Sequence, residues 1–138
     1  MDFPEAGGGR FAEIPTGAGS DEACAKRLVA RDSGRVLGTL RIATKKPWAI
    51  DLRFFTPCEK ALYLHAMAVC PDRQRAGIGR ACIEEARRIA RLWPAQAIRL
   101  DAYDSPAGAG EFYSRCGFRE VGRATYRKVP LIYFEMLF

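Results

Sequence analysis

The sequence lacks the apolar stretches and the cysteine spacings that mark several classes of protein. No apolar run approaches the roughly 20 residues that a membrane-spanning helix needs. The first residues lack the basic region and the apolar core of a secretory signal peptide. The five cysteines are odd in number, and no two of them are spaced as C-x-x-C. We therefore expect a cytoplasmic protein with no membrane span, no disulfide framework and no metal site.

The charge and the length of the chain limit its partners. The 138 residues are enough for one domain with a hydrophobic core, and the formal net charge is +6. Much of this charge comes from arginines between residues 73 and 91, which suit a polyanionic ligand. No recognised nucleic-acid-binding motif accompanies them, so nucleic acid is not expected as a partner.

The chain divides into two parts. Residues 1–20 are rich in glycine, contain two prolines and show little periodicity, which predicts a flexible arm. Residues 21–138 are expected to form the folded domain. Within it we expect strands at 24–30, 36–44, 48–55, 62–69, 97–102, 118–126 and 131–138, and helices at 80–93 and 109–116.

The expected order of elements predicts an α/β (α+β) fold, in which helices flank a mixed β-sheet. The turn residues Asp32-Ser-Gly34 indicate a hairpin between the first two strands. The connection Arg127-Lys-Val-Pro130 between the last two strands is expected to be too long for a two-residue hairpin turn.

A glycine-containing turn joins the strand at 62–69 to the amphipathic helix at 80–93. Its sequence is Cys70-Pro-Asp-Arg-Gln-Arg-Ala-Gly-Ile-Gly-Arg80. Unpaired backbone N–H groups and the positive end of the helix dipole meet at such a turn and favour an anion, most often a phosphate. Gly77 and Gly79 have no Cβ, so a ligand oxygen can approach the backbone directly.

This turn matches one of three phosphate-binding patterns at every fixed position. The Walker loop needs a lysine after its last glycine, and none follows Gly79. A dinucleotide-binding fingerprint would use Gly77 and Gly79 with Asp101 as the ribose-binding acid, but Cys82 stands at the third glycine position. The third pattern, [QR]-x-x-G-x-[GA], is matched at every fixed position by Gln74-Arg-Ala-Gly77-Ile-Gly79.

This third pattern is the pyrophosphate loop of the GNAT acetyltransferases, and a second motif supports the resemblance. Phe112-Tyr113-Ser-Arg-Cys-Gly117-Phe118 matches the F-Y-x-x-x-G-F run of that family, on the expected element. Residues 24–138 therefore resemble the GNAT N-acetyltransferase core. The resemblance implies two adjacent parallel strands that splay apart, acetyl-CoA as the donor, and a primary amine as the acceptor. The amine would belong to a small molecule, a protein N-terminus or a lysine.

The resemblance also implies which residues bind the coenzyme. The backbone of Met67, Ala68 and Val69 would pair with the pantetheine arm as an added strand. Tyr113 would direct its hydroxyl at the coenzyme sulfur and protonate the leaving thiolate. The family usually has an asparagine where Pro106 stands, so that contact would pass to Asp104, Ser105 or water, with Ala109 alongside. The pyrophosphate would be held by Gln74, Arg75, Ala76, Gly77, Ile78, Gly79 and Arg80.

His65 is the candidate general base, because it is the one histidine and its ordinary pKa of ~6.5 suits proton removal at neutral pH. Strand alternation places Tyr63, His65 and Met67 on one face and Leu64, Ala66 and Ala68 on the other. With a histidine at this position, the strand is similar to that of the arylalkylamine branch of the family, in which the histidine relays the proton through water. Many members carry a glutamate nearby, and Tyr63 stands there instead. The other interpretation of His65 is a hydrogen-bonded residue of the sheet with no part in catalysis.

The start of the chain departs from the family, which opens with a strand and two helices that wall the acceptor site. Here the arm, residues 48–55 and a partner subunit are the candidates for that wall, with Asp51, Arg53 and Asp101 as polar groups. Exposed Trp48, Phe54 and Phe55 would indicate a homodimer face. The alternative function is a non-catalytic acyl-CoA-binding module that regulates or binds a partner.

Overall fold

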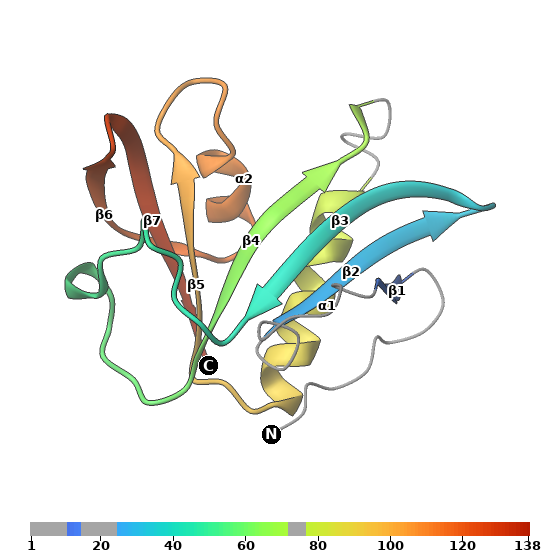
Figure 1. The fold of residues 1–138 in the computed structure, drawn as a ribbon, viewed down its shortest axis with the longest axis horizontal. Helices are drawn as coiled ribbons and strands as arrows, with labels where there is room; N and C mark the ends of the chain where they lie inside the picture. The colour runs from blue at the N-terminus through green and yellow to red at the C-terminus, as the bar shows by residue number, and fades with distance from the viewer. Residues whose placement is uncertain (1–10, 15–24, 72–76) are drawn as a thin grey trace.

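The computed structural model describes residues 11–14, 25–71 and 77–138. A seven-stranded sheet carries the fold, in the order β1-β2-β3-β4-β5-β7-β6 (Figure 1). The described pairings are antiparallel except for β4 with β5, which run parallel. The strands are β1 (Phe11–Ile14), β2 (Ala25–Asp32), β3 (Arg35–Ala43), β4 (Ala61–Val69), β5 (Ala97–Tyr103), β6 (Arg119–Tyr126) and β7 (Val129–Leu137). The mixed sheet confirms the α+β fold class.

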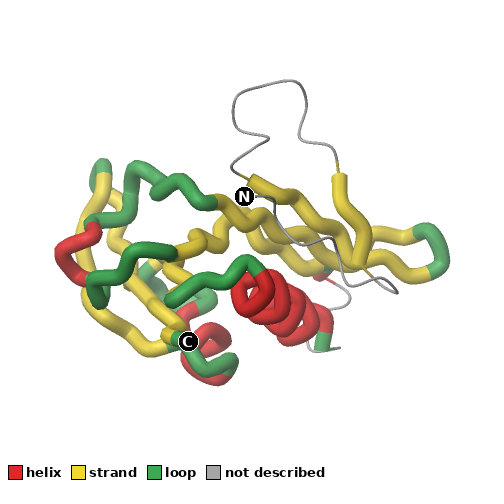
Figure 2. The backbone as a smooth tube through the Cα atoms, turned by 90° about the horizontal axis from the view of Figure 1, so that it is seen from below, coloured by secondary structure: helices red, strands yellow, loops and turns green. Residues whose placement is uncertain are grey.

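Helices and a long connection cover opposite faces of the sheet. The α-helices are α1 (Ile78–Leu92) and α2 (Gly110–Arg115), and both contribute side chains to the larger core cluster. Figure 2 shows the long helix α1 against one face of the sheet. The other face is covered in part by the connection between β3 and β4, which contains the short 3₁₀-helix η2 (Leu52–Phe54). We call these the helix face and the helix-free face. No helix in the described segments is long and apolar enough to cross a bilayer.

Helix α1 packs on the sheet through the apolar stripe that the sequence predicts. Cys82, Ala86 and Ile89 are fully buried on this stripe. The helix approaches β3 closely, because a Cβ on Gly38 would lie 3.1 Å from Ala68 O and 3.1 Å from Ile78 Cγ2. Glycine at this position therefore lets the first turn of α1 sit against the centre of the sheet.

A β-bulge changes the face assignment in β4. Ala66 has a φ of 56°, and the register with β3 shifts between Thr39 and Arg41. Two residues of β4 thus oppose one residue of β3, and the side-chain alternation restarts one residue later. Met67 consequently packs against the core cluster of the helix face. The expectation that Met67 shares a face with Tyr63 and His65 is wrong, because simple alternation does not continue through a bulge.

Strands β4 and β5 separate beyond the bulge. They pair in parallel only over Ala61–Tyr63 and Ala97–Arg99 within the described residues. In Figure 1 the two strands begin together near the C-terminus and diverge toward the top. The bend and added twist that a bulge gives its strand account for this divergence. The splayed pair of parallel strands expected from the family resemblance is therefore present.

The expected strand at 48–55 is wrong. This segment forms turns and η2, with Asp51 capping the 3₁₀-helix by accepting a hydrogen bond from the Arg53 N–H. Its apolar content reflects the cover it provides, since Ile50 and Phe55 are buried against Tyr133 on the helix-free face. A run of apolar residues can cover a sheet as well as join one.

Two other expectations are wrong, one about the connection between β6 and β7 and one about part of the N-terminal arm. Strands β6 and β7 are joined by a two-residue turn, Arg127-Lys128, in which both residues have positive φ, as a type I′ turn requires. The sequence missed it because neither residue is a glycine or an asparagine. In the stretch expected to be a flexible arm, Phe11–Ile14 instead forms β1 and pairs antiparallel with β2. The rest of that stretch lies outside the described residues.

Candidate functional site

The free edges of β4 and β5 bound the candidate site. Ala68 and Val69 pair with β3 on one side, while no pairing with β5 extends past Tyr63 and Arg99 in the described chain. The backbone groups of Met67–Val69 that point toward β5 thus lack a strand partner. An extended ligand could form hydrogen bonds with such an edge. The role of Met67, Ala68 and Val69 in binding pantetheine stays a prediction.

The start of α1 lies at the end of β4. Gly77 caps the helix in the left-handed conformation, with φ 81°, and as a glycine it provides no side-chain cap. Among the described residues no side chain accepts a hydrogen bond from the first-turn amides, and amides of this kind are suited to an anion. Gln74, Arg75 and Ala76 lie outside the described residues, so the expected pyrophosphate contacts there stay predictions.

Gly79 has a packing role that the sequence did not suggest. A Cβ at this position would lie 3.0 Å from Cζ of Phe112 and 3.7 Å from Cγ2 of Val69. The absence of a side chain lets α2 bring Phe112 against the first turn of α1. The glycine-containing turn and the F-Y-x-x-x-G-F run, which carry the family resemblance, thus lie close together at the site.

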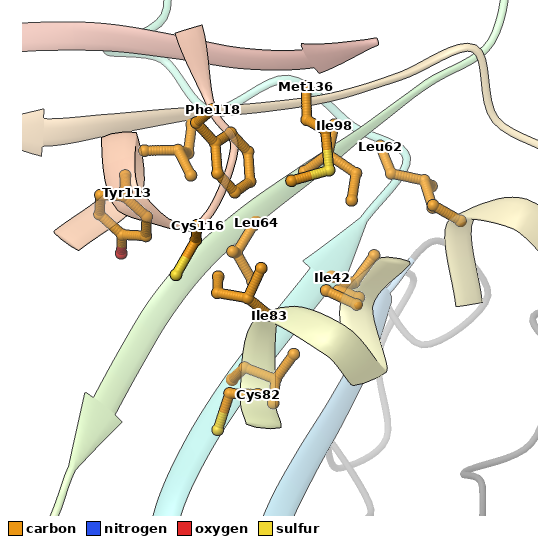
Figure 3. Packing of buried hydrophobic residues seen from close by; sticks show 14 of the residues in the cluster. Ile42, Leu62, Leu64, Cys82, Ile83, Ile98, Tyr113, Cys116, Phe118 and Met136 are labelled. Atoms are coloured by element: carbon orange, nitrogen blue, oxygen red, sulfur yellow. The ribbon is translucent and has the colours of Figure 1, made fainter. Parts of the chain in front are cut away.

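Tyr113 lies on α2 within the core cluster and is 8% exposed. Its ring packs edge-on against Phe118 at a centroid distance of 5.7 Å, and Figure 3 shows it beside Cys116 and Phe118. Burial raises the pKa of Tyr113 to about 12, and the charge of Asp101 adds to the effect. The hydroxyl stays protonated at neutral pH and donates no hydrogen bond to another described residue. It can therefore supply a proton to a thiolate.

His65 lies on the helix-free face and is partly buried. Burial lowers its pKa, and the charges of Arg41 and Arg27 lower it further. Arg41 Nη1 donates a hydrogen bond to His65 Nε2, which requires that nitrogen to be unprotonated. His65 is thus held as the neutral imidazole, the form that can accept a proton.

Asp101 lies across the divergence from His65. The register pairs Tyr63 with Arg99, and His65 and Asp101 each follow two residues later, on the helix-free face. Burial raises the pKa of Asp101, and its carboxylate accepts no hydrogen bond from the described residues. A partly buried carboxylate of this kind can bind an ammonium group or take its proton.

The connection between β3 and β4 is tied to the sheet and walls the helix-free face. Tyr133 donates a hydrogen bond to the Ala49 carbonyl, and buried Glu135 accepts hydrogen bonds from the Thr56 N–H and hydroxyl. Arg99, which is 5% exposed, donates to the Thr56 carbonyl at 2.8 Å. These bonds fix the segment that the sequence analysis offered as a wall of the acceptor site.

Two of the cavities lined by described residues open on this face. One of about 180 Å³ is lined by Arg41, Lys45 and His65 together with Ala43, Lys46, Pro47 and Trp48. The other, of about 470 Å³, lies beside Tyr126 and Tyr133. Lys46 and Trp48 line both cavities, and Trp48 is 85% exposed.

Asp51 and Arg53 interact with each other. They form an ion pair at 2.7 Å, and the hydrogen bonds from Arg53 lower the pKa of Asp51 to about 2. The proposed homodimer face is only partly exposed, since Phe55 is 5% exposed and packs on Tyr133.

The loop after β5 contains the other expected coenzyme contacts. Asp104 lies 3.4 Å from Arg123, and Ala109 precedes the first turn of α2. Ser105 Oγ is buried without a hydrogen-bond partner in this part of the structure. The coenzyme contacts of Asp104 and Ala109 stay predictions. Among the residues that the structure places, no cluster of His, Cys, Asp or Glu could hold a metal.

The fold is similar to those of solved acetyltransferases. A ribosomal-protein-alanine N-acetyltransferase from Brucella melitensis is 20% identical, with a TM-score of 0.65 over 83% of this chain and 69% of that chain. An IAA acetyltransferase from Bacillus cereus is 18% identical, with a TM-score of 0.63 over 83% of this chain and 78% of that one. An aminoglycoside 6'-N-acetyltransferase complexed with coenzyme A is 14% identical, with a TM-score of 0.66 over 84% and 74%. At these identities the likeness shows the fold alone.

A comparison with curated protein sequences found no match. The family resemblance seen in the sequence is nevertheless confirmed by a family model. The model of the acetyltransferase (GNAT) family matches residues 3–118, which is more than half of the chain, and the chain therefore belongs to that family.

Proposed function

We propose that this chain is an N-acetyltransferase that transfers the acetyl group of acetyl-CoA to a primary amine. The observation that carries the proposal is the divergence of β4 and β5 between Tyr113 and the glycine-capped start of α1. An unpaired strand edge suits the amide groups of pantetheine, and the amides at the start of a helix suit a pyrophosphate. A solved relative of the same fold is complexed with coenzyme A. We place the reaction in the cytoplasm.

The residues beside the divergence of β4 and β5 would supply the proton transfers that acetyl transfer needs. The thioester provides an acyl group that an amine can attack directly. Attack forms a C–N bond and breaks the C–S bond, so one proton must leave the amine and one must reach the thiolate. His65, held neutral, and Asp101 are the groups able to take the first proton. Tyr113, whose pKa of about 12 keeps it protonated, would give the second.

A second candidate function is a coenzyme-binding module without turnover. The observation in its favour is that Arg41 already occupies the Nε2 atom of His65, the only histidine in the sequence. No carboxylate is present on β4 to replace it. Such a module would bind acetyl-CoA at the same cleft and release no free coenzyme in the presence of amines.

The test measures acetyl-CoA binding by calorimetry and coenzyme A release by chromatography over a panel of amines. Chromatography is preferred to a thiol reagent because Cys58 and Cys70 are partly exposed. Tyr113→Phe should lower kcat about 10²-fold, the lower end of the range for a positioned acid, and leave acetyl-CoA affinity unchanged. Tyr103→Phe, on the exposed end of β5, is the matched control.

The outcomes separate the two functions. Binding without turnover across the panel would favour the module, and the absence of binding would reject both. Wild-type kcat in the Tyr113→Phe variant would remove this hydroxyl from the mechanism. Light scattering on the purified chain tests the expected homodimer in the same samples.

A further inference from the structure

Cations without carboxylate partners lie side by side on the helix-free face. Arg27 on β2 stands directly opposite Arg41 on β3, and Arg41 stands opposite His65 on β4. Like charges directly opposite each other in a sheet repel. Neither arginine forms an ion pair with a described residue, whereas six other arginines or lysines have such partners. This arrangement is favourable once an anion lies between the two guanidinium groups.

The cavity that Arg41 and His65 line has the size of a small ligand. Its volume of about 180 Å³ equals that of roughly six water molecules in the liquid. Arg41, Lys45 and Lys46 supply positive charge to its lining, which contains no carboxylate. Lys46 also holds the wall in place, since its Nζ donates to the Ile50 carbonyl at 2.7 Å. The cavity thus suits a short anionic group better than a polymer.

Arg41 connects this cavity to the candidate base. Its guanidinium donates to His65 Nε2, the atom that would have to accept a proton from the amine. The charged groups facing His65 are Arg41 on β3, Arg27 on β2, Lys45 and Lys46 on the connecting segment, and Asp101 on β5. An anion that draws Arg41 away would release Nε2 and offset the positive charge around the ring.

We propose that the acceptor is a small amine that also carries an anionic group, and that this group binds between Arg41 and Arg27 while the amine enters the cleft beside His65. The inference rests on the proposed function and adds the substrate class to it. Neighbouring strands lie about 4.8 Å apart, so the anion would sit roughly 5–10 Å from β4. That span fits an acid separated from its amine by three to five carbon atoms.

The kinetic test compares acceptors of equal length and different charge. We expect kcat/KM for 4-aminobutanoate or 3-aminopropylphosphonate to exceed that for butylamine by about tenfold or more, the value of one charge-assisted contact. The acid that gives the larger ratio shows whether the site takes a carboxylate or a phosphonate. In Arg41→Gln the ratio of acid to butylamine should fall about tenfold, and this ratio does not depend on the overall activity that the variant retains.

Matched variants control for charge and for folding. Arg41→Lys should retain part of the preference, because the positive charge remains. Arg31→Gln, four residues beyond Arg27 on β2 and opposite Val36 instead of Arg41, should leave the ratio unchanged. An unchanged ratio in both Arg41→Gln and Arg27→Gln would overturn the proposal, as would equal use of the three amines by the wild type.

A second measurement needs neither acetyl-CoA nor activity. The sequence contains one histidine, so the imidazole proton signals of the untagged protein report His65 alone. With sodium butanoate the pKa of His65 should rise relative to sodium chloride at the same ionic strength, and Arg41→Gln should abolish the difference. If no amine is acetylated but this shift occurs, the proposed function fails while the anion site stands. Identical titrations in the two salts would reject the anion site itself.

Discussion

Replacing Glu135 with glutamine tests how the wall of the site is held. Glu135 is 1% exposed, and its side chain accepts hydrogen bonds from the Thr56 N–H at 3.0 Å, the Thr56 hydroxyl at 2.6 Å and Arg119 at 2.6 Å. Burial alone would raise its pKa, but these hydrogen bonds prevail and the pKa is lowered. Glutamine has nearly the same shape but only one acceptor oxygen. Its amide group would face a donor, and one partner would lose its bond.

The expected cost follows from the Thr56 contacts. The Arg119 side chain is 66% exposed, so solvent screens its ion pair and that pair adds little. A buried donor left without an acceptor costs about 1–3 kcal/mol, and we expect a loss of about 2 kcal/mol in the free energy of unfolding. For a chain of this length that loss lowers Tm by about 8 °C.

Urea denaturation of the wild type and Glu135→Gln at several pH values measures this loss. Because the pKa of Glu135 is lowered on folding, its charge stabilises the protein fully above its ordinary pKa of 4.5. The difference between the two proteins should therefore be constant above that pH and shrink as the pH falls below it. Glu120→Gln, whose exposed side chain pairs with Arg123, should change stability by less than about 0.5 kcal/mol. Equal stability of Glu135→Gln and wild type at pH 7 would refute the anchoring role.

Three further changes test other parts of the structure. His65→Gln should remove the acidic limb of the kcat/KM profile, which we expect below pH 6.5 because burial and the neighbouring arginines lower the pKa of His65; an unchanged profile would exclude it as the base. Arg127→Asn with Lys128→Gly should raise stability by about 0.5–1 kcal/mol in urea denaturation, because both positions have positive φ. Gly38→Val should lower it by about 1–3 kcal/mol through overpacking against α1, and wild-type stability would contradict the close approach.

The sequence predicted the elements that are marked by their own apolar periodicity and by turn residues next to them in the chain. The apolar run at 62–69 and the stripe containing Cys82, Ala86 and Ile89 correspond to β4 and α1, and Pro94 follows the end of the helix. Segment 48–55 was misassigned, because its apolar residues cover a sheet face built from strands distant in sequence. Local composition does not distinguish covering a sheet from joining it.

The candidate site was predicted less completely than the fold. Tyr113, His65 and Asp101 could be named from motifs and residue types, but the contact between Arg41 and His65 depends on the pairing of β3 with β4. The bulge at Ala66 gave no signal in the sequence, since alanine is not a residue that favours positive φ. The one-residue shift in side-chain alternation at the bulge places Met67 on the helix face instead of the helix-free face.

The bulge at Ala66 also has an evolutionary consequence. Leu62 and Leu64 before it and Met67 and Val69 after it all pack on the helix face, so Ala66 is one residue more than regular alternation requires. In a chain without that residue, regular alternation would keep the same side chains on the helix face. Strand β4 could then pair with β5 along its whole length. Such a deletion would favour a more continuous sheet and close the divergence between the two strands. Under the proposed function, selection for activity, and not for stability, would preserve Ala66.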